Sequence, residues 1–184
     1  MPLRTWKKLS ESVVFKNPWW TYKRDAFELP SGKAGEYHYV HTNGSSMVLP
    51  IMEDGTILLV NQYRYLLNRE SLEFPCGSVK EGFTHDETAR HELVEETGYS
   101  AGSLEHLSSI YTTPGFCDEE LHIFLGTGLH QSPHGHRREE GELSMTIQPM
   151  LLQEAITMIE TGEIKDAKTI IGLLLIERRM RGKH

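Results

Sequence analysis

One segment of the chain carries both a start and a stop signal for an α-helix. Thr84 and Glu87 have the Thr-x-x-Glu spacing of a capping box, in which each side chain satisfies a backbone N–H at the start of a helix. Gly98 is typical of a helix end, where the chain turns with a left-handed backbone. These signals predict a helix from about His85 to Thr97.

Three glutamates of the predicted helix, Glu92, Glu95 and Glu96, stand three and four positions apart, so their side chains share one face. Ala89 and Leu93 border that face and should point towards a core. Like charges at this spacing repel, and a hard divalent cation such as Mg²⁺ or Mn²⁺ would offset the repulsion because it prefers oxygen ligands. The alternative interpretation is a solvated acidic helix face.

Strand patterns lie on both sides of this helix in the sequence. Residues 11–41 alternate loosely between apolar and polar side chains and predict a small antiparallel sheet. Asp54-Gly55 is a strong hairpin signal between two strand-like runs. The other predicted elements are strands at 46–52, 56–63, 104–112, 120–129 and 144–148, helices at 152–159 and 167–179, and a polar loop over 130–142. Hairpins mixed with helices predict an α/β sandwich rather than a doubly wound sheet.

Composition and charge exclude several classes of protein. The 184 residues suffice for one ordinary domain with a small extension, and the net charge of −7 argues against general nucleic-acid binding. The longest apolar run, 170–176, is too short to cross a bilayer, and no apolar run follows the charged N-terminus. Because the apolar runs are short, we expect no membrane contact. Cys76 and Cys117 cannot form a disulfide framework or a four-ligand zinc site, so we expect a cytoplasmic protein.

The stretch from Gly77 to Tyr99 resembles the Nudix box, Gly-x5-Glu-x7-Arg-Glu-U-x-Glu-Glu-x-Gly-U, where U is apolar. The matching positions are Gly77, Glu92, Leu93, Glu95, Glu96, Gly98 and Tyr99. The resemblance implies a Nudix fold, an α/β/α sandwich with a mixed sheet. It also implies hydrolysis of a pyrophosphate bond with roughly two or three Mg²⁺ or Mn²⁺ ions. The implied metal ligands are the carboxylates of Glu92, Glu95 and Glu96 and the carbonyl of Cys76, and Glu96 is also implied in catalysis.

Two positions differ from the box. Phe83 stands where the box has its first Glu, and His91 stands where it has Arg. In the family this Glu and Arg support the loop and orient a metal-binding carboxylate. One interpretation is a coupled replacement in which His91 still hydrogen-bonds a carboxylate. The other is weakened catalysis, which would permit a non-catalytic module that senses a nucleotide sugar.

Flanking sequence resembles the ADP-ribose pyrophosphatase branch of the family. Gln62-Tyr-Arg-Tyr65 and Leu72-Glu-Phe-Pro-Cys-Gly77 look like that branch's approach to the box, and Pro114 stands sixteen residues after Gly98, a spacing that marks the branch. The segment 162–169 resembles the one before its final helix. The implied substrate is a nucleoside diphosphate sugar. ADP-ribose is favoured and would give AMP and ribose 5-phosphate; GDP-mannose or another nucleotide sugar is the alternative, and a dinucleoside polyphosphate or oxidised nucleoside triphosphate a more distant one.

Residue-by-residue comparison implies further roles. Arg64 matches an arginine that binds the substrate's phosphates, a use suited to a planar, permanently charged group. Glu73 matches a carboxylate at the mouth of the metal site, with a cross-strand salt bridge as its structural alternative. Gly77 and Pro114 are also implied to contact the substrate. A base or ligand is expected in the loop holding Glu139, Glu140 and Glu142, where the pattern favours Glu140 as the base and Glu142 as a ligand, against a flexible acidic loop.

We expect residues 1–43 to form an N-terminal β extension and residues 44–184 to form the Nudix domain. In this branch the extension exchanges across a homodimer and contributes to the pocket for the base. Its aromatic residues include Trp20, which could stack on a purine, although core packing or dimer contact accounts for most of them. His130, His134 and His136 could suggest a transition-metal site, but a plain loop is the favoured interpretation.

Overall fold

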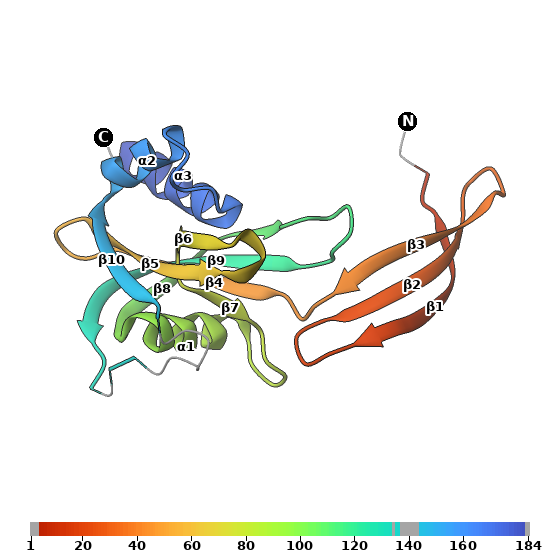
Figure 1. The fold of residues 1–184 in the computed structure, drawn as a ribbon, viewed down its shortest axis with the longest axis horizontal. Helices are drawn as coiled ribbons and strands as arrows, with labels where there is room; N and C mark the ends of the chain where they lie inside the picture. The colour runs from red at the N-terminus through yellow and green to blue at the C-terminus, as the bar shows by residue number, and fades with distance from the viewer. Residues whose placement is uncertain (1–3, 134, 137–143, 183–184) are drawn as a thin grey trace. The chain divides into compact units, whose positions relative to one another are not determined.

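The computed structural model describes residues 4–133, 135–136 and 144–182, and its chain divides into two compact units. The first unit contains residues 1–44 and 110–120, and the second contains residues 45–109 and 121–184. Each unit is described below by itself, with the element labels of Figure 1.

The first unit is built on a three-stranded antiparallel sheet with the order β1-β2-β3 (Figure 1). Its strands are β1 (Lys7–Lys16), β2 (Thr21–Glu28) and β3 (Ala34–His41), which confirms the predicted N-terminal sheet and extends its start to Lys7. The side chain of Asn17 shapes the first turn by accepting hydrogen bonds from the backbone N–H groups of Trp19 and Trp20. An Asn side chain bonding nearby backbone N–H groups is a usual way to stabilise a tight turn.

The segment 110–120 pairs with β3 through main-chain hydrogen bonds. Val40 donates to the carbonyl of Phe116 at 2.8 Å, and the N–H of Asp118 donates back to the carbonyl of Val40 at 3.1 Å. The Tyr37 hydroxyl also donates to the carbonyl of Gly115 at 2.8 Å. The loop that contains Pro114 therefore belongs to the same unit as the N-terminal sheet, a pairing between segments far apart in the sequence.

The described residues of the second unit form two sheets and three α-helices. The mixed sheet has the order β7-β4-β9-β8, with β4 parallel to β9 and antiparallel to β7; the other sheet is antiparallel, with the order β10-β5-β6. The strands are β4 (Ser45–Pro50), β5 (Thr56–Arg64), β6 (Arg69–Glu73), β7 (Cys76–Ser78), β8 (Tyr99–Tyr111), β9 (Glu120–Gln131) and β10 (Thr146–Leu151). The helices are α1 (His85–Thr97), α2 (Leu152–Glu160), α3 (Ala167–Arg181) and a 3-10 turn, η1 (Tyr65–Leu67).

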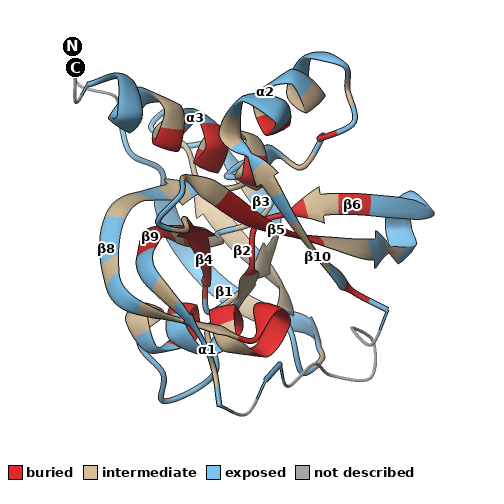
Figure 2. Ribbon diagram, turned by 90° about the vertical axis from the view of Figure 1, so that its left-hand side faces the viewer, coloured by how far each residue is buried: buried red, intermediate tan, exposed pale blue. Residues whose placement is uncertain are grey.

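Helices cover both sides of these sheets, which confirms the predicted α/β/α sandwich. Figures 1 and 2 both show α1 on one side and α2 with α3 on the other. All six residues of β4 are buried, and Val48 packs with Ala89 and Leu93 of α1 and Phe124 of β9 in one apolar cluster. No helix in the described part of the chain is long and apolar enough to cross a membrane.

The α1 helix has the predicted bounds and both predicted caps. The hydroxyl of Thr84 accepts from the N–H of Glu87 at 3.2 Å, and the Glu87 carboxylate accepts from the N–H of Thr84 at 2.8 Å. Gly98 has φ +73°, the left-handed conformation that a glycine adopts at little cost. These local interactions explain why sequence alone located this helix.

The prediction that Asp54-Gly55 joins two paired strands in a hairpin is wrong. The turn forms, but the strands on either side of it meet only at an isolated bridge between Ile51 and Ile57 and then enter different sheets. A turn signal does not require the flanking strands to pair along their length. β4 is buried along its whole length, and it is paired on both edges by β7 and β9 instead.

The polar loop predicted over 130–142 begins later than expected, because β9 continues to Gln131 and includes His130. His136 is exposed, and His134 lies outside the described residues. Among the residues that the structure describes, the only group of three or more potential metal ligands is in α1, so His130 and His136 do not contribute to one.

Candidate active site

Three buried carboxylates on α1 form the centre of the site. Glu92, Glu95 and Glu96 are 7%, 6% and 2% exposed, although their helix also has a solvated face with Asp86 and Arg90. This rules out the solvated acidic face considered from the sequence. Burying a carboxylate is unfavourable unless opposite charge or hydrogen bonds compensate it. Three of them on one buried face are therefore suited to a cation.

Gly77 of β7 lies directly against the carboxylate of Glu92. A Cβ atom at this position would overlap the carboxyl carbon and both carboxyl oxygens of Glu92. β7 also carries Cys76, which is half-buried and pairs with Met47 of β4. The glycine is thus needed for close approach between the strand and the acidic helix face, and it brings the main chain around Cys76 to this face.

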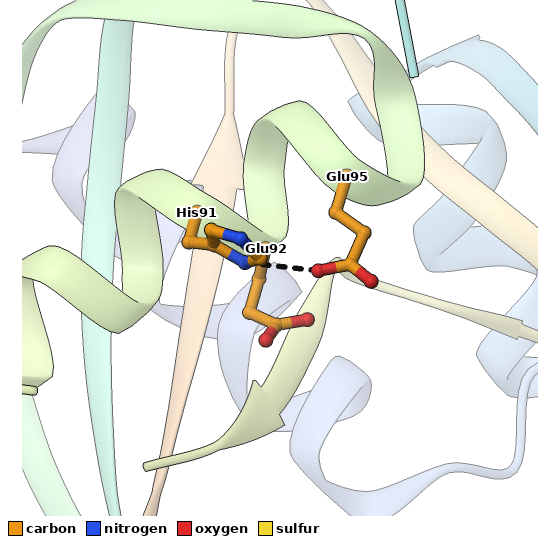
Figure 3. Close-up of side chains that lie close together, drawn as sticks. All are labelled: His91, Glu92 and Glu95. Atoms are coloured by element: carbon orange, nitrogen blue, oxygen red, sulfur yellow. Dashed lines mark ion pairs between the residues drawn. The ribbon is translucent and has the colours of Figure 1, made fainter. Parts of the chain in front are cut away.

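His91 lies beside the acidic face and contacts Glu95. The Nδ1 atom of His91 lies 2.9 Å from Oε2 of Glu95. Figure 3 marks this ion pair with a dashed line. The ring of Phe83 packs edge-on against the His91 imidazole, with centroids 6.2 Å apart and an interplanar angle of 81°. The two residues that depart from the box therefore contact each other, which agrees with a coupled replacement.

The donor set fits a divalent cation. One ligand atom each from His91, Glu92 and Glu95 lie within 4.8 Å of one another, a separation compatible with ligation of one ion. Glu96 is buried on the same helix but is not part of that group. Oxygen ligands with a close glycine backbone are the chemistry that hard divalent cations select.

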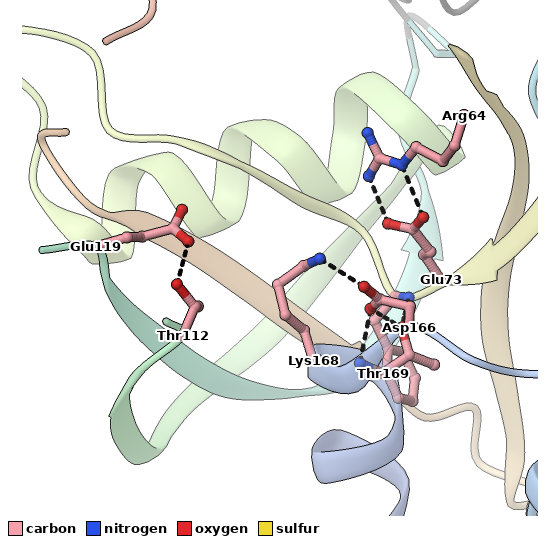
Figure 4. A network of polar contacts seen from close by, with 8 residues as sticks. Arg64, Glu73, Thr112, Glu119, Asp166, Lys168 and Thr169 are labelled. Carbon is pink, nitrogen blue, oxygen red and sulfur yellow. Dashed lines mark hydrogen bonds and ion pairs between the residues drawn. The ribbon is translucent and has the colours of Figure 1, made fainter. Parts of the chain in front are cut away.

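Arg64 and Glu73 form a bidentate ion pair between β5 and β6 (Figure 4). The Nε atom of Arg64 donates to Glu73 at 2.7 Å, and Nη2 donates to the other carboxylate oxygen. These hydrogen bonds are the main cause that raises the pKa of the Arg64 guanidinium. Glu73 is buried whereas Arg64 is partly exposed, so the cross-strand salt bridge is present and the guanidinium still reaches solvent.

Comparison with known proteins identifies the family of this chain. Residues 41–171 match the model of the NUDIX domain, and residues 6–40 match that of the nucleoside diphosphate sugar hydrolase N-terminal domain. The chain belongs to the Nudix hydrolase family. Nudix hydrolases are generally dependent on divalent metals, which agrees with the donor set on α1.

Two named relatives and one solved structure are similar to this chain. An ADP-ribose pyrophosphatase of Bacillus subtilis is 35% identical over 150 residues, covering 82% of this chain and 80% of its own. A GDP-mannose pyrophosphatase of Pectobacterium atrosepticum is 29% identical, covering 94% of this chain and 93% of its own. The crystal structure of an ADP compounds hydrolase superposes with a TM-score of 0.86 at 20% identity, covering 100% of this chain and 98% of that one, and shows the same fold.

The Nudix domain also contains an ion pair that the sequence analysis missed. Lys168 Nζ lies 2.7 Å from Asp166, and Asp166 caps α3 by accepting from the N–H of Thr169 at 2.9 Å. Burial alone would raise the pKa of Asp166, but the charge and hydrogen bond of Lys168 and the hydrogen bonds from Thr169 hold it below its ordinary value. Burial acts to lower the pKa of Lys168, and the charge of Asp166 outweighs it and raises that pKa.

This pair is linked to the strand that precedes the box. The Thr169 hydroxyl donates to Asp166 and accepts from the backbone N–H of Phe74 at 3.0 Å. Arg64 interacts electrostatically with Asp166, and Lys168 does so with Glu73, so the two ion pairs in Figure 4 form one network. The sequence signal for it was Asp166 at a helix start, which indicates a cap but not this contact.

The other residues predicted to act in the site lie in the first unit or outside the described residues. Pro114 lines a pocket of about 350 Å³. The rest of the lining consists of the aromatic residues Tyr37, Tyr39, Tyr111 and Phe116, together with Cys117 and Asp118. Trp20 instead packs against Phe15 at 5.6 Å and is 39% exposed. Glu139, Glu140 and Glu142 lie outside the described residues.

Proposed function

We propose that this Nudix hydrolase cleaves the pyrophosphate bond of nucleoside diphosphate sugars, with ADP-ribose favoured and AMP and ribose 5-phosphate as its products. The observation that carries the proposal is the buried face of Glu92, Glu95 and Glu96, closed on one side by Gly77. The two family matches and the named ADP-ribose and GDP-mannose pyrophosphatases support the substrate class.

A bound Mg²⁺ or Mn²⁺ would neutralise the diphosphate and lower the pKa of a bound water. In the proposal Glu92, Glu95 and Glu96 hold the cation with the Cys76 carbonyl, and roughly two or three ions are expected. Arg64 orients the phosphates with the guanidinium edge that Glu73 leaves open, because Nη1 makes no bond to that carboxylate. Glu73 is proposed to lie at the mouth of the site, and Gly77 is proposed to contact the substrate.

Other residues are proposed to accept the proton of the water and to bind the nucleobase. Glu140 is proposed to take a proton from the attacking water, and Glu142 to add a ligand. Pro114 is proposed to contact the substrate, and Trp20 is proposed to stack on the base.

Measurement of products from a panel of nucleotide sugars tests the proposal. With Mg²⁺ or Mn²⁺, ADP-ribose should yield AMP with kcat/KM at least about tenfold above that for GDP-mannose. If GDP-mannose is cleaved faster, the alternative named by the Pectobacterium relative is correct. Tight ADP-ribose binding with no product from any sugar would instead identify a sensor, the possibility that Phe83 and His91 keep open.

We also propose that the chain forms a homodimer through its N-terminal sheet, with exchanged strands. β1 is an edge strand with exposed apolar side chains at Leu9, Val13, Val14 and Phe15. Long apolar edges favour association with another chain. Val13→Lys is expected to lower the mass measured by sedimentation equilibrium towards that of a monomer. Leu174→Lys, which replaces an exposed apolar residue of α3, should leave the mass unchanged; a wild-type monomer would contradict the proposal.

The compartment is proposed to be the cytoplasm. Cys76 and Cys117 are both thiols and not disulfide partners, as expected where thiols stay reduced.

A further inference from the structure

The His91 imidazole is placed as a ligand and not only as a support. In the box this position is an arginine, which carries a permanent positive charge and cannot bind a cation. Imidazole has a ring nitrogen with a lone pair and is a common metal ligand. Figure 3 shows its ring beside the carboxylates of Glu92 and Glu95, on the same stretch of α1. The replacement therefore changes the chemistry of the donor set.

The distances agree with shared ligation. Two ligands at right angles on one ion, each with a bond of about 2.1 Å, lie about 3 Å apart. The separation of 2.9 Å between His91 Nδ1 and Glu95 Oε2 equals this value, and an atom of Glu92 completes a set within 4.8 Å. The same separation also suits a His91–Glu95 ion pair without a metal. A directly bound nitrogen nucleus distinguishes the two arrangements.

The ring of Phe83 packs beside the half-exposed His91 imidazole. Phe83 contacts one side of the imidazole edge-on, at a centroid distance of 6.2 Å. In the box the position of Phe83 holds a glutamate, which would attract the imidazole towards itself as an ion-pair partner. An apolar ring at that position offers no acceptor, so the polar group that His91 contacts is Glu95. Phe83 thus helps to orient the nitrogen towards the acidic face.

We infer that His91 ligates the cation together with Glu92 and Glu95, and that the site selects a first-row transition-metal ion over Mg²⁺. The inference rests on the proposed function for its biological meaning, since it concerns the metal of the same site. Mg²⁺ prefers oxygen ligands and gains little from imidazole, whereas affinity for a nitrogen ligand rises from Mn²⁺ to Co²⁺ and Ni²⁺. A mixed nitrogen and oxygen set therefore favours the transition metals.

Pulsed electron paramagnetic resonance of the Mn²⁺-loaded protein tests this without substrate. The wild type is expected to show modulation from a directly bound ¹⁴N nucleus, and His91→Gln is expected to lose it. Titration of the metal-free protein with Co²⁺ should show affinity at least about tenfold weaker in His91→Gln, with Mg²⁺ affinity changed by less than about threefold. His91→Arg, which places the box residue there, should behave like His91→Gln and serves as the second variant.

A matched control comes from another group of histidines in the same unit. His85 and His122 stack at 3.6 Å, with His106 5.2 Å from His122, and they could supply a nitrogen signal of their own. His106→Gln should retain the modulation. If His106→Gln loses it and His91→Gln keeps it, or if the wild type shows none, the inference is wrong.

The outcomes separate this inference from the proposed function. Hydrolysis of ADP-ribose without ¹⁴N modulation would leave the function standing and remove His91 from the ligands. Modulation that depends on His91, in a protein that cleaves no nucleotide sugar, would support the ligand and overturn the function.

Discussion

Glu96→Gln is expected to lower kcat for ADP-ribose by about 10³-fold or more, with the fold intact. Glu96 is the most buried of the three carboxylates on α1, at 2% exposed. Glutamine has nearly the same shape but no charge, so the variant keeps the packing and loses a charged oxygen ligand. The removed charge acts in a buried site, where an electrostatic interaction is stronger than in water.

Steady-state kinetics and thermal melting measured together test this expectation. In the absence of metal the melting temperature of Glu96→Gln should equal or exceed that of the wild type, because one of three neighbouring negative charges is gone. Added Mg²⁺ or Mn²⁺ should raise the melting temperature of the wild type and raise that of the variant less, since a ligand stabilises the folded state more when it binds more tightly. Glu154→Gln, at an exposed position of α2, is the control and should behave as wild type. A Glu96→Gln enzyme with the wild-type rate would show that the metal assignment is wrong.

Gly77→Ala is expected to lower kcat/KM by about 10²-fold, although it adds a single methyl group. That methyl group would occupy the position of the Glu92 carboxyl group, so either the carboxylate or β7 must move. A displacement of about 1 Å in a catalytic constellation can cause a loss of this size. Overpacking should also lower the free energy of unfolding by about 1–3 kcal/mol.

The two effects of Gly77→Ala are measured by kinetics and by urea denaturation. Gly182→Ala is the control, because a Cβ there makes only an ordinary contact, 3.5 Å from the carbonyl oxygen of Arg178. It should change neither quantity. Unaltered kcat/KM and an unaltered rise in melting temperature with metal would mean that the position of Glu92 does not matter for the site.

Local signals in the sequence predicted α1 and its acidic face. The capping box and Gly98 act through hydrogen bonds within a few residues, so their outcome depends little on the rest of the chain. The spacing of Glu92, Glu95 and Glu96 places them on one face of any helix. The box and its flanking residues then indicated the family, and the family matches confirmed it.

Interactions between distant segments could not be predicted in the same way. The Asp54-Gly55 turn formed, but β4 paired with β7 and β9 because its residues are buried along its whole length. Lys168 and Asp166 became part of the Arg64–Glu73 network only because α3 packs near β6 and bonds to Phe74. Pro114 entered an aromatic pocket through pairing of its loop with β3.

The sequence by itself determined the chemistry of this protein: an acidic face on a capped helix, a glycine ahead of it, and the family that uses them. Tertiary structure decided the surroundings of those groups. It buried the carboxylates, set Gly77 against Glu92, and placed the His91 nitrogen 2.9 Å from Glu95. The physical reason is that helix periodicity and capping are properties of neighbouring residues. Burial and close approach depend on which distant strand or ring occupies the adjacent space.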